Sequence, residues 1–322
     1  MESLLKVILE NKAIDKFLNN EGRLVLNDVT SLSYLTSGAY LKSKKNIVLV
    51  ASNLYIAQNI YEHISSIIGE DKCLLYPVDE IYHEKNYAYS KEMLAQRLYV
   101  MDKCFDGEKR ILITHIEGVT RYLPNPDIYK KRTLFLKKGN SYKLEDLIKS
   151  LIDMSFIRVN KVSQSLQFAL RGDILDIFSI NNENPLRIEF FDDEIESIRY
   201  FDTATQTSIL EIDEIKIFPA TDLLIDEDLN IGKDLVLEKL EQDLKKLPFD
   251  VKEKLNQKVR YDIEDILQNG FNENLNNYFH YFNKKKFNIL DYFSSDITLV
   301  YQSDEVLKNH EFKVVENDKF VK

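Results

Sequence analysis

The chain has 322 residues, too many for one ordinary domain, so we expect two or three domains. Its hydrophobic content of 44% is enough for real cores, and its formal net charge of −10 argues against a generic nucleic-acid binder, because phosphates are neutralised by clustered Lys and Arg. With two cysteines, no signal peptide and no apolar run of membrane-spanning length, the sequence excludes a disulfide framework and a membrane span, and we expect a cytoplasmic protein.

The first part of the chain, residues 1–124, is predicted to alternate strands and helices. Strands are expected at 23–26, 46–50, 73–76 and 110–114. The intervening helices include one that Ser52 caps and Gly69 ends, and one that begins near Ser90. Strands that are apolar throughout and separated by helices indicate a parallel sheet covered on both faces.

A pair of prolines at Pro124 and Pro126 marks a boundary in the chain. Residues 125–212 are predicted to form an inserted α+β module, with a helix at 143–154 among alternating strands. The α/β domain should therefore be interrupted by a separate module.

Residues 213–322 are predicted to be the second part of the α/β domain. They contain a strand at 214–219, a long charged helical region, and an apolar strand at 297–301 that should return to the first sheet. The chain stops after Lys322 without a convincing terminal element, so we expect it to be a fragment of a longer protein.

The most informative segment of the module is a predicted hairpin, whose two strands are joined by a polar turn at 179–184. In its second strand, period-two alternation separates an apolar face from an outward face that carries Arg187, Glu189 and Phe191. The apolar face consists of Leu186, Ile188 and Phe190. A large aromatic beside a guanidinium on a solvated surface is typical of a binding hot spot. On composition alone, a neighbouring loop that half-covers Phe191 explains the pattern somewhat better.

The segment after the first predicted strand lies where a P-loop would lie in a nucleotide-binding α/β domain. A P-loop needs glycines to wrap phosphates, a Lys to neutralise them and a Ser or Thr to hold magnesium. The corresponding positions here are Asp28, Ser31, Ser33, Tyr34 and Leu35. Asp28 would repel phosphate, and the motif G-x-x-x-x-G-K-[ST] occurs nowhere in the sequence. We therefore predict a degenerate P-loop.

The acidic pair that would complete an ATP site is also replaced. At the end of the last predicted strand stand Tyr301 and Gln302, and neither side chain can hold magnesium as a carboxylate does. We predict a nucleotide-binding shape without catalytic residues or a cofactor.

The sequence offers only weak candidates for a metal site. The five histidines are scattered without metal-ligand spacing, and only His115, at the end of a predicted strand, has a suggestive position. The carboxylates of Asp192, Asp193, Glu194 and Glu196 could form a metal site or an acid/base pair, but a turn in a solvated hairpin explains them better. We expect no metal.

Several segments together resemble the amino-terminal region of the bacterial transcription-repair coupling factors, which is itself similar to the excision-repair helicase UvrB. The resemblance runs over most of residues 21–304 and is strongest at 170–178, 187–199 and 217–220, with further matches at 261–264, 269–278 and 290–293. It implies a UvrB-like fold: a degenerate P-loop, helicase-like parallel-sheet domain interrupted by an α+β module.

Two departures separate the coupling factors from UvrB. UvrB carries an intact P-loop and an acidic pair, and it inserts a long aromatic hairpin that grips damaged DNA. Here only residues 77–89 lie between the third strand and the next helix, which is too short for that hairpin. These losses are typical of the coupling factors, whose ATP-driven motor lies elsewhere in the chain.

The resemblance implies that the inserted module binds UvrA, through positions that match Arg171, Arg187 and Phe191, with Glu189 and Asp193 as a rim. The guanidiniums would meet carboxylates or carbonyls of UvrA while Phe191 fills a shallow apolar pocket. The resemblance also implies that other domains mask this face until RNA polymerase is engaged, and that polymerase and DNA are contacted only through regions absent here.

Three functions remain open at this point. The first is a non-catalytic adaptor that recruits UvrA in transcription-coupled repair. The second is an ATP-dependent helicase or damage-recognition subunit of the UvrB type, which would show ATP-dependent stabilisation. The third is a direct DNA-binding module, which would show a steep salt dependence.

Overall fold

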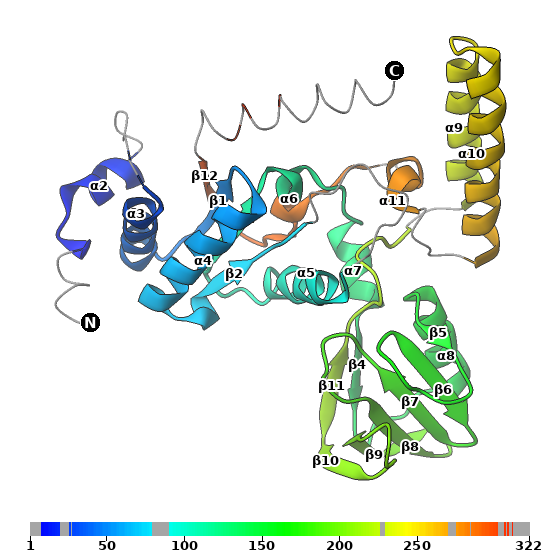
Figure 1. The fold of residues 1–322 in the computed structure, drawn as a ribbon. Coiled ribbons are helices and arrows are strands. Elements are labelled where there is room, and N and C mark those ends of the chain that lie inside the picture. Colours follow the sequence, from blue (N-terminus) through cyan, green and yellow to red (C-terminus); the bar gives the residue numbers. More distant parts are fainter. Residues whose placement is uncertain are drawn as a thin grey trace. The chain divides into compact units, whose positions relative to one another are not determined.

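A computed structural model describes residues 8–19, 26, 28–78, 90–225, 229–269, 275–283 and 285–301, with isolated positions at 306, 308 and 311. The chain divides into two compact units (Figure 1). Unit 1 comprises residues 1–88, 99–121 and 288–322, and unit 2 comprises residues 89–98 and 122–287. A separation of residues 125–212 from residues 213–322 as domains remains a prediction.

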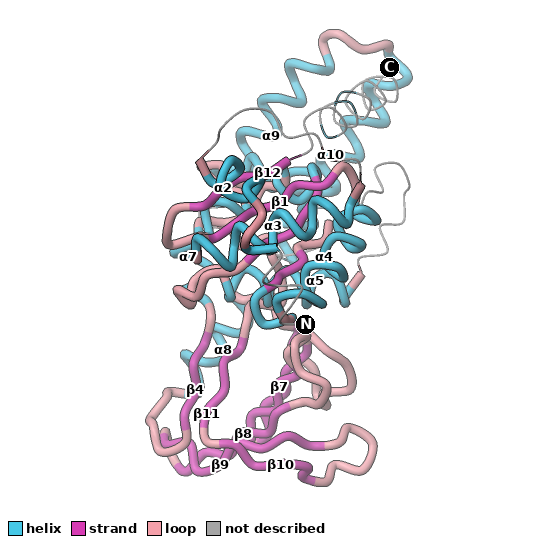
Figure 2. Tube along the Cα trace, turned by 90° about the vertical axis from the view of Figure 1, so that its left-hand side faces the viewer, coloured by secondary structure: helices cyan, strands magenta, loops and turns pink. Residues whose placement is uncertain are grey.

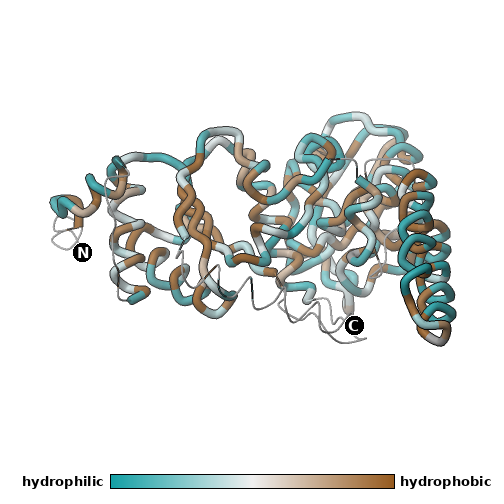
Figure 3. The backbone as a smooth tube through the Cα atoms, turned by 90° about the horizontal axis from the view of Figure 1, so that it is seen from above, coloured by the Kyte–Doolittle hydropathy of each residue, from teal (hydrophilic) through white to brown (hydrophobic). Residues whose placement is uncertain are grey.

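In the described part of the chain, unit 1 is built on a four-stranded parallel sheet with strand order β12-β1-β3-β2. Its strands are β1 (Asn46–Ala51), β2 (Cys73–Leu75), β3 (Ile111–His115) and β12 (Ile297–Tyr301). The first three are buried along their whole length, and their apolar runs are brown in Figure 3. Burial on both faces is typical of parallel sheets. The parallel sheet and the return of the 297–301 strand to it are therefore confirmed.

Among the described residues, the helices of unit 1 are α2 (Lys12–Leu18), α3 (Val29–Ser43), α4 (Leu54–Ile68) and α6 (Ile116–Thr120), with the 3-10 helices η1 (Glu70–Lys72) and η3 (Ile289–Tyr292). The helix predicted near Ser90 is α5 (Lys91–Lys103). The prediction that Ser52 caps α4 is wrong, because the side chain of Asn53 accepts a hydrogen bond from the backbone of Ile56 at 2.9 Å. Gly69 ends α4 as predicted.

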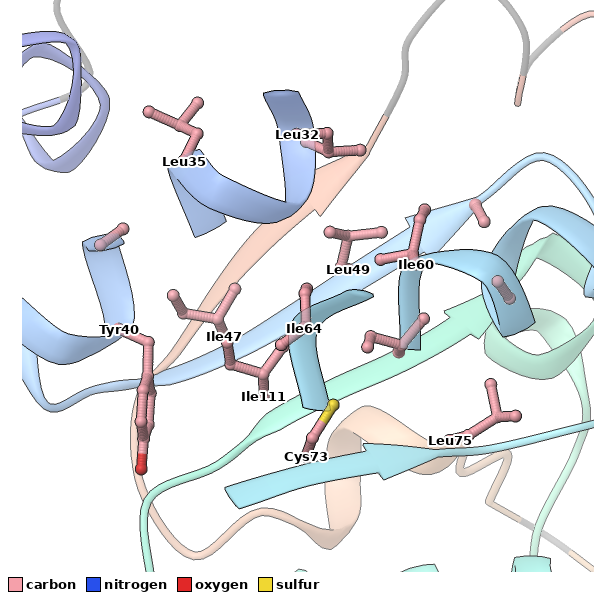
Figure 4. Close-up of a cluster of buried hydrophobic side chains, with 14 of the residues drawn as sticks. Leu32, Leu35, Tyr40, Ile47, Leu49, Ile60, Ile64, Cys73, Leu75 and Ile111 are labelled. Carbon is pink, nitrogen blue, oxygen red and sulfur yellow. The ribbon is translucent and has the colours of Figure 1, made fainter. Parts of the chain in front are cut away.

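The core of unit 1 lies between one face of the sheet and α3 and α4 (Figure 4). Ile47 and Leu49 of β1 point toward Ile60 and Ile64 of α4 in this cluster. Cys73 is buried in the same cluster, as its apolar sequence context predicts. Burial raises the pKa of the Cys73 thiol to about 12, so the thiol behaves as a small core hydrophobe.

The predicted P-loop segment is helical rather than a loop. Asp28 is the N-cap of α3, and its carboxylate accepts hydrogen bonds from the backbone N–H of Ser31 at 2.7 Å and from the Ser31 hydroxyl at 2.9 Å. An Asp at this position satisfies helix N–H groups that would otherwise lack partners, so the helix begins at Val29. Apart from Leu26, the strand predicted at 23–26 lies outside the described residues.

The strands described for unit 2 belong to two sheets, and most of them are labelled in Figure 2. A six-stranded sheet has the order β10-β9-β8-β7-β6-β5, and β11 pairs with β4 in a two-stranded sheet. The strands are β4 (Leu134–Lys137), β5 (Ile157–Arg158), β6 (Gln167–Arg171), β7 (Ile174–Phe178), β8 (Leu186–Phe191), β9 (Glu194–Phe201), β10 (Ser208–Ile212) and β11 (Glu214–Ile217). The predicted hairpin is confirmed as β7 and β8, which pair antiparallel.

The core of this part of unit 2 lies against the inward face of the six-stranded sheet. The predicted apolar face of Leu186, Ile188 and Phe190 is fully buried in it. Helix α8 (Leu144–Asp153), which confirms the helix predicted at 143–154, contributes Leu147 and Leu151 to the same core. Helix α7 (Pro126–Arg132) precedes β4.

The charged region of unit 2 is helical, as predicted. It consists of α9 (Leu229–Leu244), α10 (Phe249–Asn269), α11 (Leu275–Tyr278) and η2 (Phe279–Tyr281), and it has a core of its own that includes Val236, Leu240 and Ile266. Within the described part of the chain, no helix combines the length and apolar character needed to cross a membrane.

Candidate functional site

The outward side of the six-stranded sheet carries a connected group of polar side chains. We define the outer face as Arg171 on β6, Asp176 on β7, Arg187, Glu189 and Phe191 on β8, and Ser197 and Arg199 on β9. Antiparallel pairing sets Asp176 directly opposite Arg187, and Arg187 directly opposite Arg199. Directly opposed side chains lie close enough to interact, so the strand register itself assembles this face.

Asp176 joins the two predicted arginines. Its Oδ2 accepts a hydrogen bond from Arg171 Nη2 at 2.6 Å, and its two oxygens accept from Arg187 Nε at 2.8 Å and Nη2 at 2.9 Å. The Asp176 side chain is 1% exposed, whereas that of Arg171 is 45% exposed. The guanidiniums expected to meet carboxylates of a partner thus already meet one in their own chain.

Arg187 is the more constrained of the two arginines, with a side chain 13% exposed. Besides its contact with Asp176, Nη2 donates to Gln206 Oε1 at 2.9 Å, and the guanidinium lies 4.2 Å from the centre of the Phe201 ring. The hydrogen bond to Asp176 raises the pKa of Arg187 despite partial burial. The guanidinium is held by bonds in its plane and by an aromatic ring against its face.

A second charge pair lies beside the first. Glu189 Oε2 accepts hydrogen bonds from Arg199 Nη1 at 2.8 Å and from the Ser197 hydroxyl at 2.9 Å, and Oε1 pairs with Arg199 Nη2. Burial by itself would raise the pKa of Glu189, but the bonds from Arg199 and Ser197 outweigh it and keep the pKa below its usual value. Glu189, predicted as a rim residue, thus holds Arg199.

Phe191 lies at the end of β8 and is 73% exposed. This exposure excludes the interpretation that a neighbouring loop half-covers its ring. The next residue, Asp192, adopts a left-handed conformation with φ 54°, and Asp193, also predicted as a rim residue, follows in the turn before β9. An exposed Phe beside a tight turn offers a rigid apolar contact at low cost in conformational entropy.

Sequence reasoning missed Asp176, Arg199 and Gln206. Asp176 offered a signal, because an acid inside the apolar strand 174–178 must find a partner when it is buried. Arg199 follows the period-two pattern of β9. Gln206 reaches Arg187 from the loop between β9 and β10, a contact that no local pattern indicates.

The predicted P-loop residues have capping or packing roles in unit 1. Ser33 donates a hydrogen bond to the carbonyl oxygen of Val29 at 2.8 Å, and Leu35 is buried in the core. Tyr34 packs against the same core at partial burial. Tyr301 ends β12 and is 53% exposed, while Gln302 lies outside the described residues.

The two weak metal candidates also have structural explanations. Asp192 and Asp193 form the turn of the β8–β9 hairpin, and no group of three His, Cys, Asp or Glu in the described residues is arranged to hold a metal ion. His115 is buried, with Nδ1 against the Glu117 carboxylate and Nε2 3.2 Å from the backbone N of Val78.

Comparison with known proteins points to one part of the chain in particular. Residues 134–223 match the family model of the UvrB interaction domain, and every residue of the outer face lies within this range. A transcription-repair-coupling factor of Bacillus subtilis (strain 168) is 32% identical over 286 residues, which cover 87% of this chain and 24% of that protein.

Other transcription-repair-coupling factors are also similar to this chain. That of Staphylococcus aureus (strain bovine RF122 / ET3-1) is 28% identical over 88% of this chain, and that of Staphylococcus epidermidis (strain ATCC 35984) is 29% identical over 79% of it. The chain spans about a quarter of the length of these relatives, at 24% and 21% of the two. The chain is therefore a homologue of part of the transcription-repair-coupling factors, and through residues 134–223 it belongs to the UvrB interaction domain family.

Proposed function

We propose that this chain is a non-catalytic adaptor region of a transcription-coupled nucleotide excision repair factor, and that the outer face of unit 2 binds UvrA. One observation carries the proposal: Phe191, 73% exposed, lies on the same strand as the anchored Arg187, within the range that matches the UvrB interaction domain. An exposed aromatic beside an ordered arginine is the composition of a protein-binding hot spot.

The chemistry of the face suits a partner that offers both an apolar pocket and hydrogen-bond acceptors. Phe191 would supply the apolar anchor, and the exposed part of Arg171 would supply guanidinium donors for carboxylates or carbonyls of UvrA. Arg187 would contribute less exposed surface, and a donor held in a fixed position. Asp193, in the adjacent turn, would lie at the rim.

Unit 1 would be the degenerate, helicase-like domain of a UvrB-like fold. Its parallel sheet and flanking helices support this assignment. At the start of α3, where a helix N-terminus could bind a phosphate, the Asp28 carboxylate takes the backbone N–H of Ser31. Hydrogen bonds from that N–H and from the Ser31 hydroxyl lower the pKa of Asp28, so it stays negative and repels phosphate. The RNA polymerase and DNA contacts would belong to other regions of the full-length relatives, and other domains would mask the outer face.

Binding to purified UvrA tests the proposal. The variants are Arg187→Ala and Phe191→Ala, and the matched controls are Phe135→Ala, a phenylalanine 54% exposed on β4, and Arg158→Ala, an exposed arginine on β5. Each site variant should weaken binding by about 1–4 kcal/mol. Both controls should bind as the wild type does, and thermal unfolding shows that each variant is folded.

The outcomes separate the candidate functions. Equal losses of UvrA affinity in the site and control variants would show that UvrA does not bind at the outer face. A wild-type chain that does not bind UvrA would refute the adaptor role. Saturable stabilisation by ATP would instead favour a UvrB-type ATPase.

A further inference from the structure

We infer that Asp176 is the positioning residue of the UvrA-binding face: it holds Arg171 and Arg187 in the arrangement that the partner recognises. This inference rests on the proposed function. It concerns a residue that makes no predicted contact with the partner and acts through two residues that do.

The burial of Asp176 is the first observation. Its side chain is 1% exposed although it lies on the outward side of the sheet, opposite Arg187. Both guanidiniums bond to its carboxylate, and Arg187 does so through two nitrogens. A buried carboxylate is costly unless it is paired and hydrogen-bonded, so the two arginines and Asp176 favour a single shared arrangement.

The geometry of Arg187 is the second observation. A guanidinium has five N–H donors in a rigid plane. Nε and Nη2 of Arg187 are occupied by Asp176 and Gln206, and the Phe201 ring lies 4.2 Å from the guanidinium carbon. These contacts fix the plane, and since Nη1 makes no hydrogen bond to any described residue, its two donors can meet a partner. Asp176 thereby determines the direction in which Arg187 can donate.

Arg171 depends on Asp176 in a simpler way. Its Nη2 contacts Asp176 Oδ2 at 2.6 Å, while 45% of the side chain remains exposed. Arginine has a large rotamer entropy, which binding would otherwise have to overcome. One internal contact therefore lowers the entropic cost of binding while leaving donors for the partner.

A competing role for Asp176 predicts the opposite effect of its removal. If Asp176 merely neutralised the arginines, its loss would add one positive charge to the face and tighten binding to an acidic surface. If Asp176 orients them, its loss weakens binding in spite of that added charge. The sign of the change in affinity separates the two roles.

The test is UvrA affinity of wild type, Asp176→Asn and a charge-matched control, Glu145→Gln. The control also removes one negative charge from unit 2, at an exposed residue of α8 outside the outer face, and it leaves the three hydrogen bonds to Asp176 intact. We expect Asp176→Asn to bind about tenfold or more weakly, a typical loss for a hot-spot contact, and Glu145→Gln to bind within about threefold of wild type. A thermal transition shows that each variant is folded.

A second comparison asks whether Asp176 acts through Arg187. In the Arg187→Ala background, Asp176→Asn should cause a smaller fold-loss than in wild type, because one of the two side chains that it positions is gone. An equal fold-loss in both backgrounds, or unchanged or tighter binding of Asp176→Asn itself, would overturn the inference. If Asp176→Asn does not fold, Arg187→Lys takes its place, since lysine keeps the charge but cannot make the two-point contact. Near-wild-type binding of Arg187→Lys would also overturn the inference, whereas a loss of about tenfold or more would support it.

These outcomes are distinct from failure of the proposed function. Wild type that binds UvrA, with Asp176→Asn equal to it, removes only the positioning role. Wild type that does not bind removes the adaptor function and this inference with it.

Discussion

Phe190 and Phe191 are neighbours in the sequence, but truncating Phe190 should lower the stability of the fold, whereas truncating Phe191 should weaken UvrA binding. Phe190 is 5% exposed and packs in the core of unit 2, whereas Phe191 is 73% exposed on the other side of β8. Truncating a core Phe to Ala costs about 3–5 kcal/mol of unfolding free energy, which lowers the transition temperature of a domain of this size by roughly 10 °C. Phe191→Ala should change the unfolding free energy by at most about 0.5 kcal/mol, because the ring has little to lose on unfolding.

The binding effect of Phe191 follows from the same exposure. A Phe side chain presents about 200 Å² of surface, and burying the 73% that is exposed would contribute at most about 4 kcal/mol at roughly 25 cal/mol per Å². The corresponding loss of UvrA affinity for Phe191→Ala is up to about a thousandfold. Differential scanning calorimetry measures the change in unfolding free energy, and titration calorimetry with UvrA measures the change in affinity.

One result would refute this reasoning. If Phe191→Ala lowers the transition temperature as much as Phe190→Ala does, the Phe191 ring packs against the protein in solution. A Phe191→Ala chain that is stable and binds UvrA like wild type would show that the ring is exposed without being an anchor.

Three further predictions concern stability and reactivity. Gly232→Ala should destabilise unit 2 by about 1–3 kcal/mol in chemical denaturation, because an added Cβ would lie 2.2 Å from Cδ1 of the buried Phe282. The pKa of Glu189 is lowered in the folded state, so its contribution to stability is complete above the unfolded value near 4.5 and is lost as pH falls through the folded value. The stability difference between wild type and Glu189→Gln should therefore shrink between pH 6 and pH 3, and a constant difference would contradict the assigned pairing. Burial raises the pKa of Cys73 to about 12 and also raises that of Cys104, so a thiol reagent at pH 8 should modify neither cysteine until the chain unfolds.

The sequence predicts those features of the chain that depend on local periodicity. Alternation in 185–191 separates the buried Phe190 from the exposed Phe191, and the structure confirms it. The apolar run of β12 predicts a strand that returns to the first sheet, and its parallel pairing with β1 is confirmed although about 245 residues lie between them along the chain. Both predictions succeed because the hydrophobic pattern of a strand can be read from the strand's own residues.

The features that the sequence does not predict depend on competition between neighbours or on contacts between strands. Ser52 and Asn53 are both good caps, and only the backbone decides that Asn53 caps α4. The sequence places Asp28 in a degenerate P-loop and does not predict that Asp28 caps a helix by accepting a hydrogen bond from Ser31. Asp176, Arg187 and Arg199 align only once the register of three strands is known.

The strand register also places carboxylates where they offset the repulsion between two opposed arginines on the outer face. Arg187 and Arg199 lie directly opposite each other, and like charges in this position repel. Asp176, which also bonds to Arg171, binds Arg187 from one side and Glu189 binds Arg199 from another, so the two opposed guanidiniums bond to different carboxylates. Three arginines and two carboxylates leave the outer face nearly neutral, so its own charges contribute little long-range attraction to a partner. What distinguishes this face is the direction of its remaining donors and the exposed ring of Phe191, which are short-range features that only a complementary surface can use.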